Sequence, residues 1–152
     1  MPVVKTNLFP RGTVLHGLRG SGKSNAARYL ASLDPDAVLV YDPQGEFPEY
    51  DRIQPKKSTY PDTVEEFARI CQKMKLEDTT KHNYRLLIID EAHLIAPNSH
   101  ALHPYVAQMN ACHRHWPLGI VWVSQRPRQL HYNIFNLADY LFLWRLPGAT
   151  DA

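Results

Sequence analysis

Eight consecutive residues have the types and spacing of a phosphate-binding loop. They are Gly17, Leu18, Arg19, Gly20, Ser21, Gly22, Lys23 and Ser24. Glycines let the backbone turn tightly and point successive N–H groups at phosphate oxygens, and a helix that follows adds its positive N-terminal end. In this pattern the lysine reaches the terminal phosphates and the following hydroxyl binds magnesium. We therefore expect all eight residues to hold ATP, with Lys23 also catalytic and Ser24 a ligand of Mg²⁺.

Two adjacent carboxylates form the second candidate feature. Asp90 and Glu91 directly follow the apolar run Leu86–Ile89. Ligands of parallel sheets bind outside the carboxyl ends of the strands, so Asp90 can meet the metal and Glu91 can take a proton from an attacking water. Two acids after a strand are also common on ordinary surfaces. Their place after a phosphate loop favours the functional role. Because Glu91 directly follows Asp90, hydrolysis by an activated water is favoured over phosphoryl transfer to a small molecule.

A glutamine stands at the tip of a third apolar run, Ile120–Val123. Gln125 can hydrogen-bond both a terminal phosphate and the lytic water, and so sense which nucleotide is bound. The alternative is a glutamine that is merely exposed on a loop. We interpret Gln125 as a catalytic sensor.

Short apolar runs alternate with helical patterns along the chain. Five runs lack polar alternation, as in strands buried on both faces: Thr13–His16, Ala37–Tyr41, Leu86–Ile89, Ile120–Val123 and Tyr140–Leu146. Helices are expected over Lys23–Ser32, from Asp62 to Met74 and over Leu102–His115. This order predicts an α/β fold with a mainly parallel five-stranded sheet and helices on both faces.

Local signals refine this arrangement. Asp62 and Glu65 have capping-box spacing, and Pro104 suggests that a helix begins nearby. The stretches Pro43–Pro61 and Ala96–Pro104 are expected to be irregular.

Composition limits the class of protein. The chain has 152 residues, 44% of them hydrophobic, which predicts a single domain over residues 1–152. A net charge of +2 is too small to indicate by itself a nucleic-acid-binding protein. Cys71 and Cys112 fit reduced thiols in the cytoplasm, and no apolar run approaches the roughly 20 residues that span a bilayer. We expect no membrane insertion.

Three segments together resemble the HerA/FtsK superfamily of DNA-pumping P-loop ATPases. They run from Val38 to Phe47, including Asp42-Pro43-Gln44-Gly45-Glu46, from Ile89 to His93, and from Ser124 to Pro127. The small size is similar to viral and phage genome-packaging ATPases. The resemblance implies the strand order 5-1-4-3-2, a hexameric ring, and ATP-driven movement of double-stranded DNA. A viral protein of this kind would lie in the host cytoplasm or the virion.

The resemblance also implies an arginine supplied by the neighbouring subunit. Arg126, Arg128 and Arg145 are candidates, with Arg126 and Arg128 favoured, although each can equally be a solvated charge. Asp42 and Glu46 would lie near the edge of the site, where a structural turn is an equal alternative. No barrel precedes the motor and the chain stops after the fifth strand, so a fragment and a minimal viral form both stay open.

Other functions remain as alternatives. One is an ATPase that powers assembly or secretion, like the zonula-occludens-toxin-like morphogenesis ATPases of filamentous phages, which resemble the same superfamily. The sequence from Asp90 to His93 also spells a helicase signature, but that group needs two such domains. A small-molecule kinase would carry an arginine-rich lid, and would not need Glu91 and Gln125.

Two weaker patterns concern metal and DNA. His100, His103, Cys112 and His115 form two pairs that a zinc site could use, but the helix expected between them would hold the pairs apart. Several basic residues could line a pore or be ordinary surface: Lys56, Lys57, Lys73, Lys75, Lys81, Arg114, Arg126 and Arg128.

Overall fold

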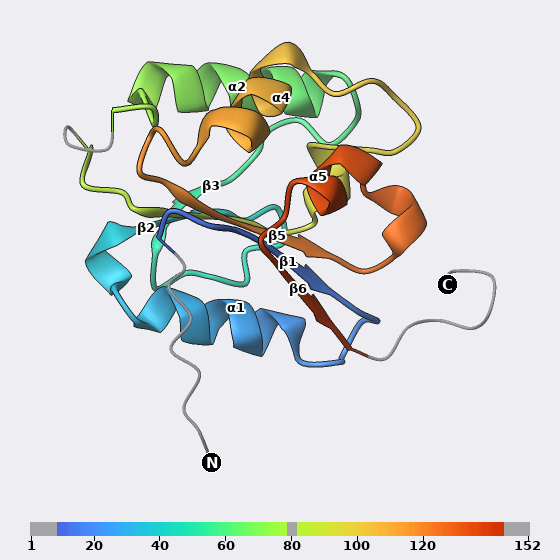
Figure 1. Ribbon diagram of the computed structural model, residues 1–152, viewed down its shortest axis with the longest axis horizontal. Helices are drawn as coiled ribbons and strands as arrows, with labels where there is room; N and C mark the ends of the chain where they lie inside the picture. The colour runs from blue at the N-terminus through green and yellow to red at the C-terminus, as the bar shows by residue number, and fades with distance from the viewer. Residues whose placement is uncertain (1–8, 79–81, 145–152) are drawn as a thin grey trace.

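A computed structural model describes residues 9–78 and 82–144 of the protein (Figure 1). In this part of the chain one sheet contains β1 Gly12–His16, β2 Val38–Tyr41, β3 Asp51–Ile53, β4 Leu86–Ile89, β5 Gly119–Ser124 and β6 Tyr140–Leu143. Its order is β3-β2-β4-β5-β1-β6, and every neighbouring pair is parallel. Without β3 this is the predicted order 5-1-4-3-2, which is therefore confirmed.

Helices cover both faces of the sheet. Figure 1 shows α1 (Lys23–Ser32) below it and α2 (Asp62–Met74), α4 (Pro104–Cys112) and α5 (Tyr132–Asn136) above it. The bounds of α1 are those predicted, and α4 begins at Pro104 as expected. The short α5 was not predicted, since five residues with one buried side chain give almost no periodic signal.

Alternate residues of the central strands face opposite layers. Ile88 and Val123 pack with Ala27 and Ala31 of α1, whereas their neighbours in the strands face the other helices. Those neighbours include Ile89 and Trp122, which pack in the same cluster as Phe67 and Met109. Burial on both faces explains why these strands are continuously apolar.

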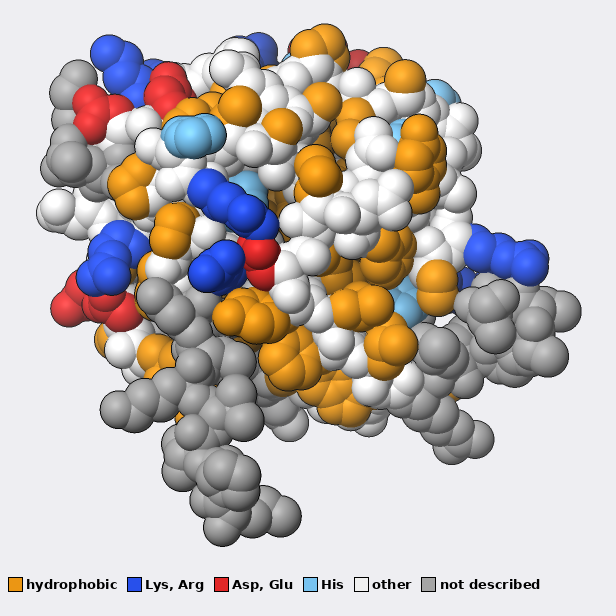
Figure 2. All heavy atoms as spheres, in the orientation of Figure 1, with side chains coloured by type: hydrophobic (Ala, Val, Ile, Leu, Met, Phe, Trp, Pro, Cys, Tyr) orange, Lys and Arg blue, Asp and Glu red, His pale blue; other side chains and the backbone are white. Residues whose placement is uncertain are grey.

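The two edge strands depart from the sequence predictions. β3 lies within the stretch expected to be irregular, and its three residues are too few and too exposed to show a strand pattern. β6 was expected to be buried, yet Leu141, Phe142 and Leu143 are 42–56% exposed. The reason is its place at the sheet edge, and Figure 2 shows hydrophobic side chains gathered there, over α5 and β6.

The predicted capping box is also wrong. Asp62 is the first residue of α2 rather than its cap, and the capping position is Pro61, which has no side-chain acceptor. The carbonyls of Thr59 and Pro61 instead accept hydrogen bonds from the first helical N–H groups. The described segments contain no helix whose length and apolar character would let it cross a bilayer.

Candidate nucleotide-binding site

The strand register brings three strand tips together at one end of the sheet. His16 of β1 pairs with Ser124 of β5, and Ile89 of β4 pairs with Trp122. The residues after β1, β4 and β5 therefore share one edge, because neighbouring parallel strands end side by side. A pocket of about 590 Å³ opens there, and its lining is Arg19, Gly20, Gly22, Lys23, Ser24, Asn25, Arg28, Gln44, Glu46, Asp90, Glu91, Val123, Ser124 and Gln125.

The loop between β1 and α1 has the conformation that its glycines predict. Gly20 and Gly22 have φ angles of 76° and 100°, a region that favours glycine. Gly17 packs so closely against Trp144 that an added Cβ would lie 2.7 Å from Trp144 Cβ. Gly22 then caps α1, whose N-terminus opens onto the pocket. Free N–H groups at such a terminus attract phosphate.

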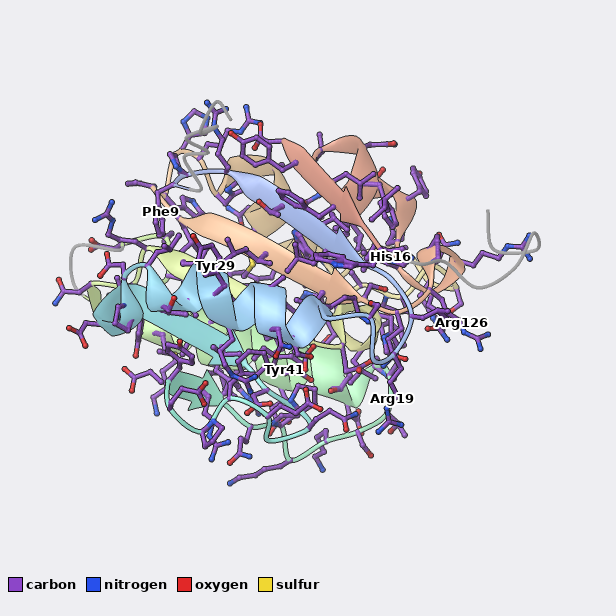
Figure 3. All side chains as sticks on the ribbon, turned by 90° about the horizontal axis from the view of Figure 1, so that it is seen from below. Phe9, His16, Arg19, Tyr29, Tyr41 and Arg126 are labelled. Atoms are coloured by element: carbon purple, nitrogen blue, oxygen red, sulfur yellow. The ribbon has the colours of Figure 1, made fainter. Side chains whose placement is uncertain are left out.

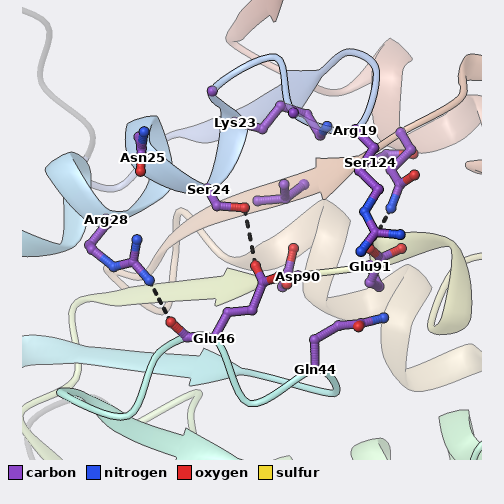
Figure 4. Close-up of a pocket in the computed structure, with 14 residues that line it drawn as sticks. Arg19, Lys23, Ser24, Asn25, Arg28, Gln44, Glu46, Asp90, Glu91 and Ser124 are labelled. Carbon is purple, nitrogen blue, oxygen red and sulfur yellow. Dashed lines mark hydrogen bonds between the residues drawn. The ribbon is translucent and has the colours of Figure 1, made fainter.

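Lys23 lies on the wall of the pocket and is only 7% exposed. Its Nζ donates a hydrogen bond to Leu18 O at 2.8 Å, so the side chain follows the loop (Figure 4). Burial lowers the pKa of Lys23, and the carboxylates of Glu91, Asp90 and Glu46 oppose that shift. The ammonium group and the three carboxylates therefore share one electrostatic site.

Asp90 carries the most perturbed carboxyl group of the pocket. It is 5% exposed, and burial, followed by the charge of Glu91, raises its pKa to about 7. A bound cation would remove this penalty because it stabilises the ionised carboxylate.

Both carboxylate oxygens of Glu91 have contacts. Gln125 Nε2 donates to Glu91 Oε1 at 2.7 Å, and His93 Nδ1 lies 3.4 Å from Glu91 Oε2. Glu91 itself has a φ angle of 48°, which is uncommon for residues other than glycine and costs of order 1–3 kcal/mol. The structure thus joins Glu91 and Gln125 from adjacent strands, and adds His93, which the sequence analysis did not single out.

The loop after β2 supplies another side of the pocket. Gln44 and Glu46 line it, whereas Asp42 is fully buried and accepts hydrogen bonds from the backbone of Glu46 and Phe47. Arg52 Nη1 lies 3.2 Å from Asp42 Oδ2. Asp42 is thus a structural residue of this turn, and Glu46 faces the site. Asn25 and Arg28 line the pocket without any earlier sequence signal, because they belong to no motif, and Gln44 lines it from the Asp42–Glu46 motif, in which it was given no role.

Not every predicted site residue lines the pocket. Gly17, Leu18 and Ser21 belong to the loop but not to the lining. Arg126 and Arg128 are exposed and outside it, although Figure 3 shows Arg126 at the same end of the molecule as Arg19. Arg145 and Lys81 lie outside the described residues.

The donor set fits magnesium. Ser24 Oγ and the carboxylates of Asp90 and Glu46 line one pocket, and Mg²⁺ prefers hard oxygen ligands. Zinc has less support. His103 caps α4 and Cys112 ends it, about 13 Å apart at 1.5 Å per residue. In the described part of the chain no group of three His, Cys, Asp or Glu residues could hold a metal ion.

Comparison with known proteins gives one sequence match and several structural ones. The model of the Flavivirus DEAD domain matches residues 63–127, which is less than half of the chain. No curated protein sequence matches it.

Solved structures match nearly the whole chain. The genome-packaging NTPase B204 of Sulfolobus turreted icosahedral virus 2, in complex with ATP-gammaS, has a TM-score of 0.79 at 18% identity, covering 96% of this chain and 79% of that one. The N-terminal domain of zonular occludens toxin from Neisseria meningitidis has a TM-score of 0.64 at 18% identity, covering 89% and 76%. Together with the loop geometry and the strand order, these likenesses show that the chain has the P-loop NTPase fold.

Proposed function

We propose that this chain is an ATP-hydrolysing motor of the HerA/FtsK type that moves double-stranded DNA, as in viral genome packaging. The observation that carries the proposal is the 2.7 Å contact between Gln125 and Glu91, at neighbouring strand tips beside the phosphate loop. A water-activating carboxylate joined to a phosphate-sensing amide suits hydrolysis. The whole chain acts as one ATPase domain.

The chain's own residues would hold the nucleotide. Residues 17–24 give N–H groups to the phosphates, and Lys23 gives its ammonium group. Ser24 and Asp90 would hold Mg²⁺, which would neutralise charge on the phosphates when bound. Burial of Asp90 and Lys23 keeps these charges in a poorly hydrated wall, where their electrostatic effect is larger than in water.

Glu91 would then act as the general base. It accepts a proton as the oxygen of water attacks the γ-phosphorus, and the bond from that phosphorus to the oxygen of ADP breaks. Gln125 would hydrogen-bond the terminal phosphate and the water. Since its amide contacts Glu91 in the structure, the same side chain can report the nucleotide state to the base.

Arginine would come from a neighbouring subunit of a hexameric ring. Arg126 and Arg128 are exposed at the catalytic end of the molecule but do not line its own pocket. That position suits a group acting across a subunit boundary, where it would stabilise charge on the transferred phosphoryl group.

Two kinds of substrate fit such a motor, double-stranded DNA and a protein that is assembled or secreted. Double-stranded DNA is favoured by the resemblance to HerA/FtsK motors and by the likeness to the packaging NTPase B204. A second candidate is an ATPase of protein assembly or secretion, which the likeness to zonular occludens toxin favours. In either role the protein would work in the cytoplasm, or in the virion if it is viral.

ATP turnover with and without linear double-stranded DNA tests the proposal, with Glu91→Gln as the blank. We expect this variant to bind ATP yet to lose about 10²–10⁴-fold in turnover, the usual contribution of a general base. DNA should stimulate the wild type, and the stimulation should fade between low and moderate salt because phosphate contacts release counterions.

If wild-type turnover does not exceed that of Glu91→Gln, the assignment of Glu91 as the base is wrong. Turnover that is well above the blank but indifferent to DNA would keep the ATPase and favour the assembly role.

A further inference from the structure

Glu46 makes a direct contact with the hydroxyl group expected to bind magnesium. Ser24 Oγ donates a hydrogen bond to Glu46 Oε2 at 3.3 Å, across the pocket from the loop after β2 (Figure 4). A serine hydroxyl has one proton and two lone pairs. When the hydroxyl donates its hydrogen bond to Glu46, the lone pairs of Ser24 Oγ are left for a metal.

The backbone of Glu46 is fixed from two sides. Asp42, at the end of β2, accepts hydrogen bonds from Glu46 N at 2.8 Å and from Phe47 N at 3.0 Å. From the other side Arg28 of α1 donates to Glu46 O. These bonds tie the loop to the helix that begins at Lys23, so the distance between Glu46 and Ser24 is held by the fold.

The guanidinium of Arg28 contacts groups other than the carboxylate of Glu46. Its Nε donates to Glu49 Oε1 at 2.7 Å, and its Cζ lies 5.2 Å from the centre of the Phe47 ring. The neighbouring Asp42 has its own cation in Arg52.

Negative charge therefore faces the pocket on three carboxylates. Glu46, Asp90 and Glu91 line it. The cations of the lining are Lys23, the exposed Arg19 and Arg28, whose guanidinium pairs with Glu49. Glu46 also contributes to the raised pKa of Asp90, after burial and Glu91. The three carboxylates do not form a metal-binding group by themselves. Their charge would instead favour a divalent cation that Ser24, Asp90 and the phosphates of a bound nucleotide hold together.

We propose that Glu46 is a positioning residue of the magnesium site, which accepts a hydrogen bond from the Ser24 hydroxyl and so directs the lone pairs of Ser24 Oγ to Mg²⁺. The inference rests on the proposed function. Groups that hydrogen-bond a metal ligand commonly change metal affinity or activity 10–100-fold when removed.

The test measures nucleotide affinity rather than turnover. A fluorescent ATP analogue is titrated into the full chain in EDTA and at increasing Mg²⁺, for the wild type and for Glu46→Ala, Glu46→Gln and Glu49→Ala. Glu49 is the matched control, since it lies on the same loop and pairs with Arg28 but does not line the pocket. Thermal unfolding checks that each variant is folded.

We expect Glu46→Ala to raise the Mg²⁺ concentration for half-maximal tightening about tenfold, with unchanged affinity in EDTA. Glu46→Gln should fall between it and the wild type, since an amide oxygen still accepts a hydrogen bond. Glu49→Ala should match the wild type.

A double-mutant cycle with Ser24→Ala decides whether Glu46 acts through Ser24. On that background Glu46→Ala should add almost nothing, because the hydroxyl it orients is gone. A full additional tenfold loss, or a Mg²⁺ titration of Glu46→Ala that superposes on the wild type, would overturn the inference. Failure of the wild type to bind ATP would instead overturn the proposed function.

Discussion

β2 and β4 are neighbours in the sheet, and each is followed directly by a buried aspartate. Asp42 is fully buried and Asp90 is 5% exposed. Asp42 accepts hydrogen bonds from two backbone N–H groups and pairs with Arg52. Asp90 has the Glu91 backbone as a hydrogen-bond partner and no ion-pair partner among the described residues, and the charge of Glu91 lies beside it.

The difference separates a structural acid from a site acid. The charge of Asp42 is compensated by the groups that shape the loop after β2, so Asp42 needs no ligand to stabilise it. Asp90 has no ion-pair partner among the described residues and faces a pocket, where a cation from solution can stabilise its charge. Perturbed acids in clefts are accordingly candidates for function.

The largest expected effect concerns Asp42 and the stability of the protein. Asp42→Ala should lower the free energy of unfolding by about 3 kcal/mol, because it leaves Arg52 and two backbone N–H groups without their acceptor. Denaturant unfolding measures the loss. Asp36→Ala, at an exposed position of the short 3-10 helix Pro35–Ala37, is the control and should stay within about 0.5 kcal/mol. Equal losses for both variants would contradict the structural role of Asp42.

Asp90 should show the opposite pattern, with a loss of activity and no loss of stability. Asp90→Asn keeps the shape and removes the charge, so ATP turnover should fall about 100-fold while the unfolding midpoint near pH 7 stays equal or rises. Turnover assays and thermal unfolding measure the two quantities on the same preparation. A variant that unfolds at a lower temperature, with turnover close to the wild type, would show that the two aspartates do not differ as the structure indicates.

Much of the fold could be predicted from the sequence, because burial on both faces makes the central strands continuously apolar. Lys23 and Asp90 could also be predicted, because each belongs to a short sequence motif whose residues are positioned by a single local segment. Asp42 and Glu46 could not be told apart, although they stand four residues apart in one motif. Their roles depend on Arg52 and Ser24, contacts that only the folded chain brings about.

The same limit explains the other misses. β3 and α5 are too short for periodicity to show, and the exposure of β6 depends on its position at the sheet edge. His93 contacts Glu91 because of the turn after β4, in which Glu91 has a positive φ angle. A spacing of two residues in the sequence does not indicate that geometry.

The third expected effect, the smallest when counted per pH unit, is a pH dependence of stability to which Asp90 contributes. Burial raises the pKa of Asp90 to about 7, from 3.8 for an unperturbed aspartate. Between these values the folded protein holds a proton that the unfolded chain has released, so the stabilisation is complete below pH 4 and is lost as pH rises to about 7. The slope for one group is at most about 1.4 kcal/mol per pH unit.

Urea unfolding in EDTA at pH 5, 6 and 7 measures this slope as the difference between the wild type and Asp90→Asn. The wild type should lose stability relative to the variant as pH rises, because only the wild type must ionise a buried acid. Asp42→Asn, examined in the same way, should not remove the slope, since the perturbed carboxyl group is still present. Parallel curves for the wild type and Asp90→Asn would mean that Asp90 is compensated after all, and the contrast between the two strand ends would disappear.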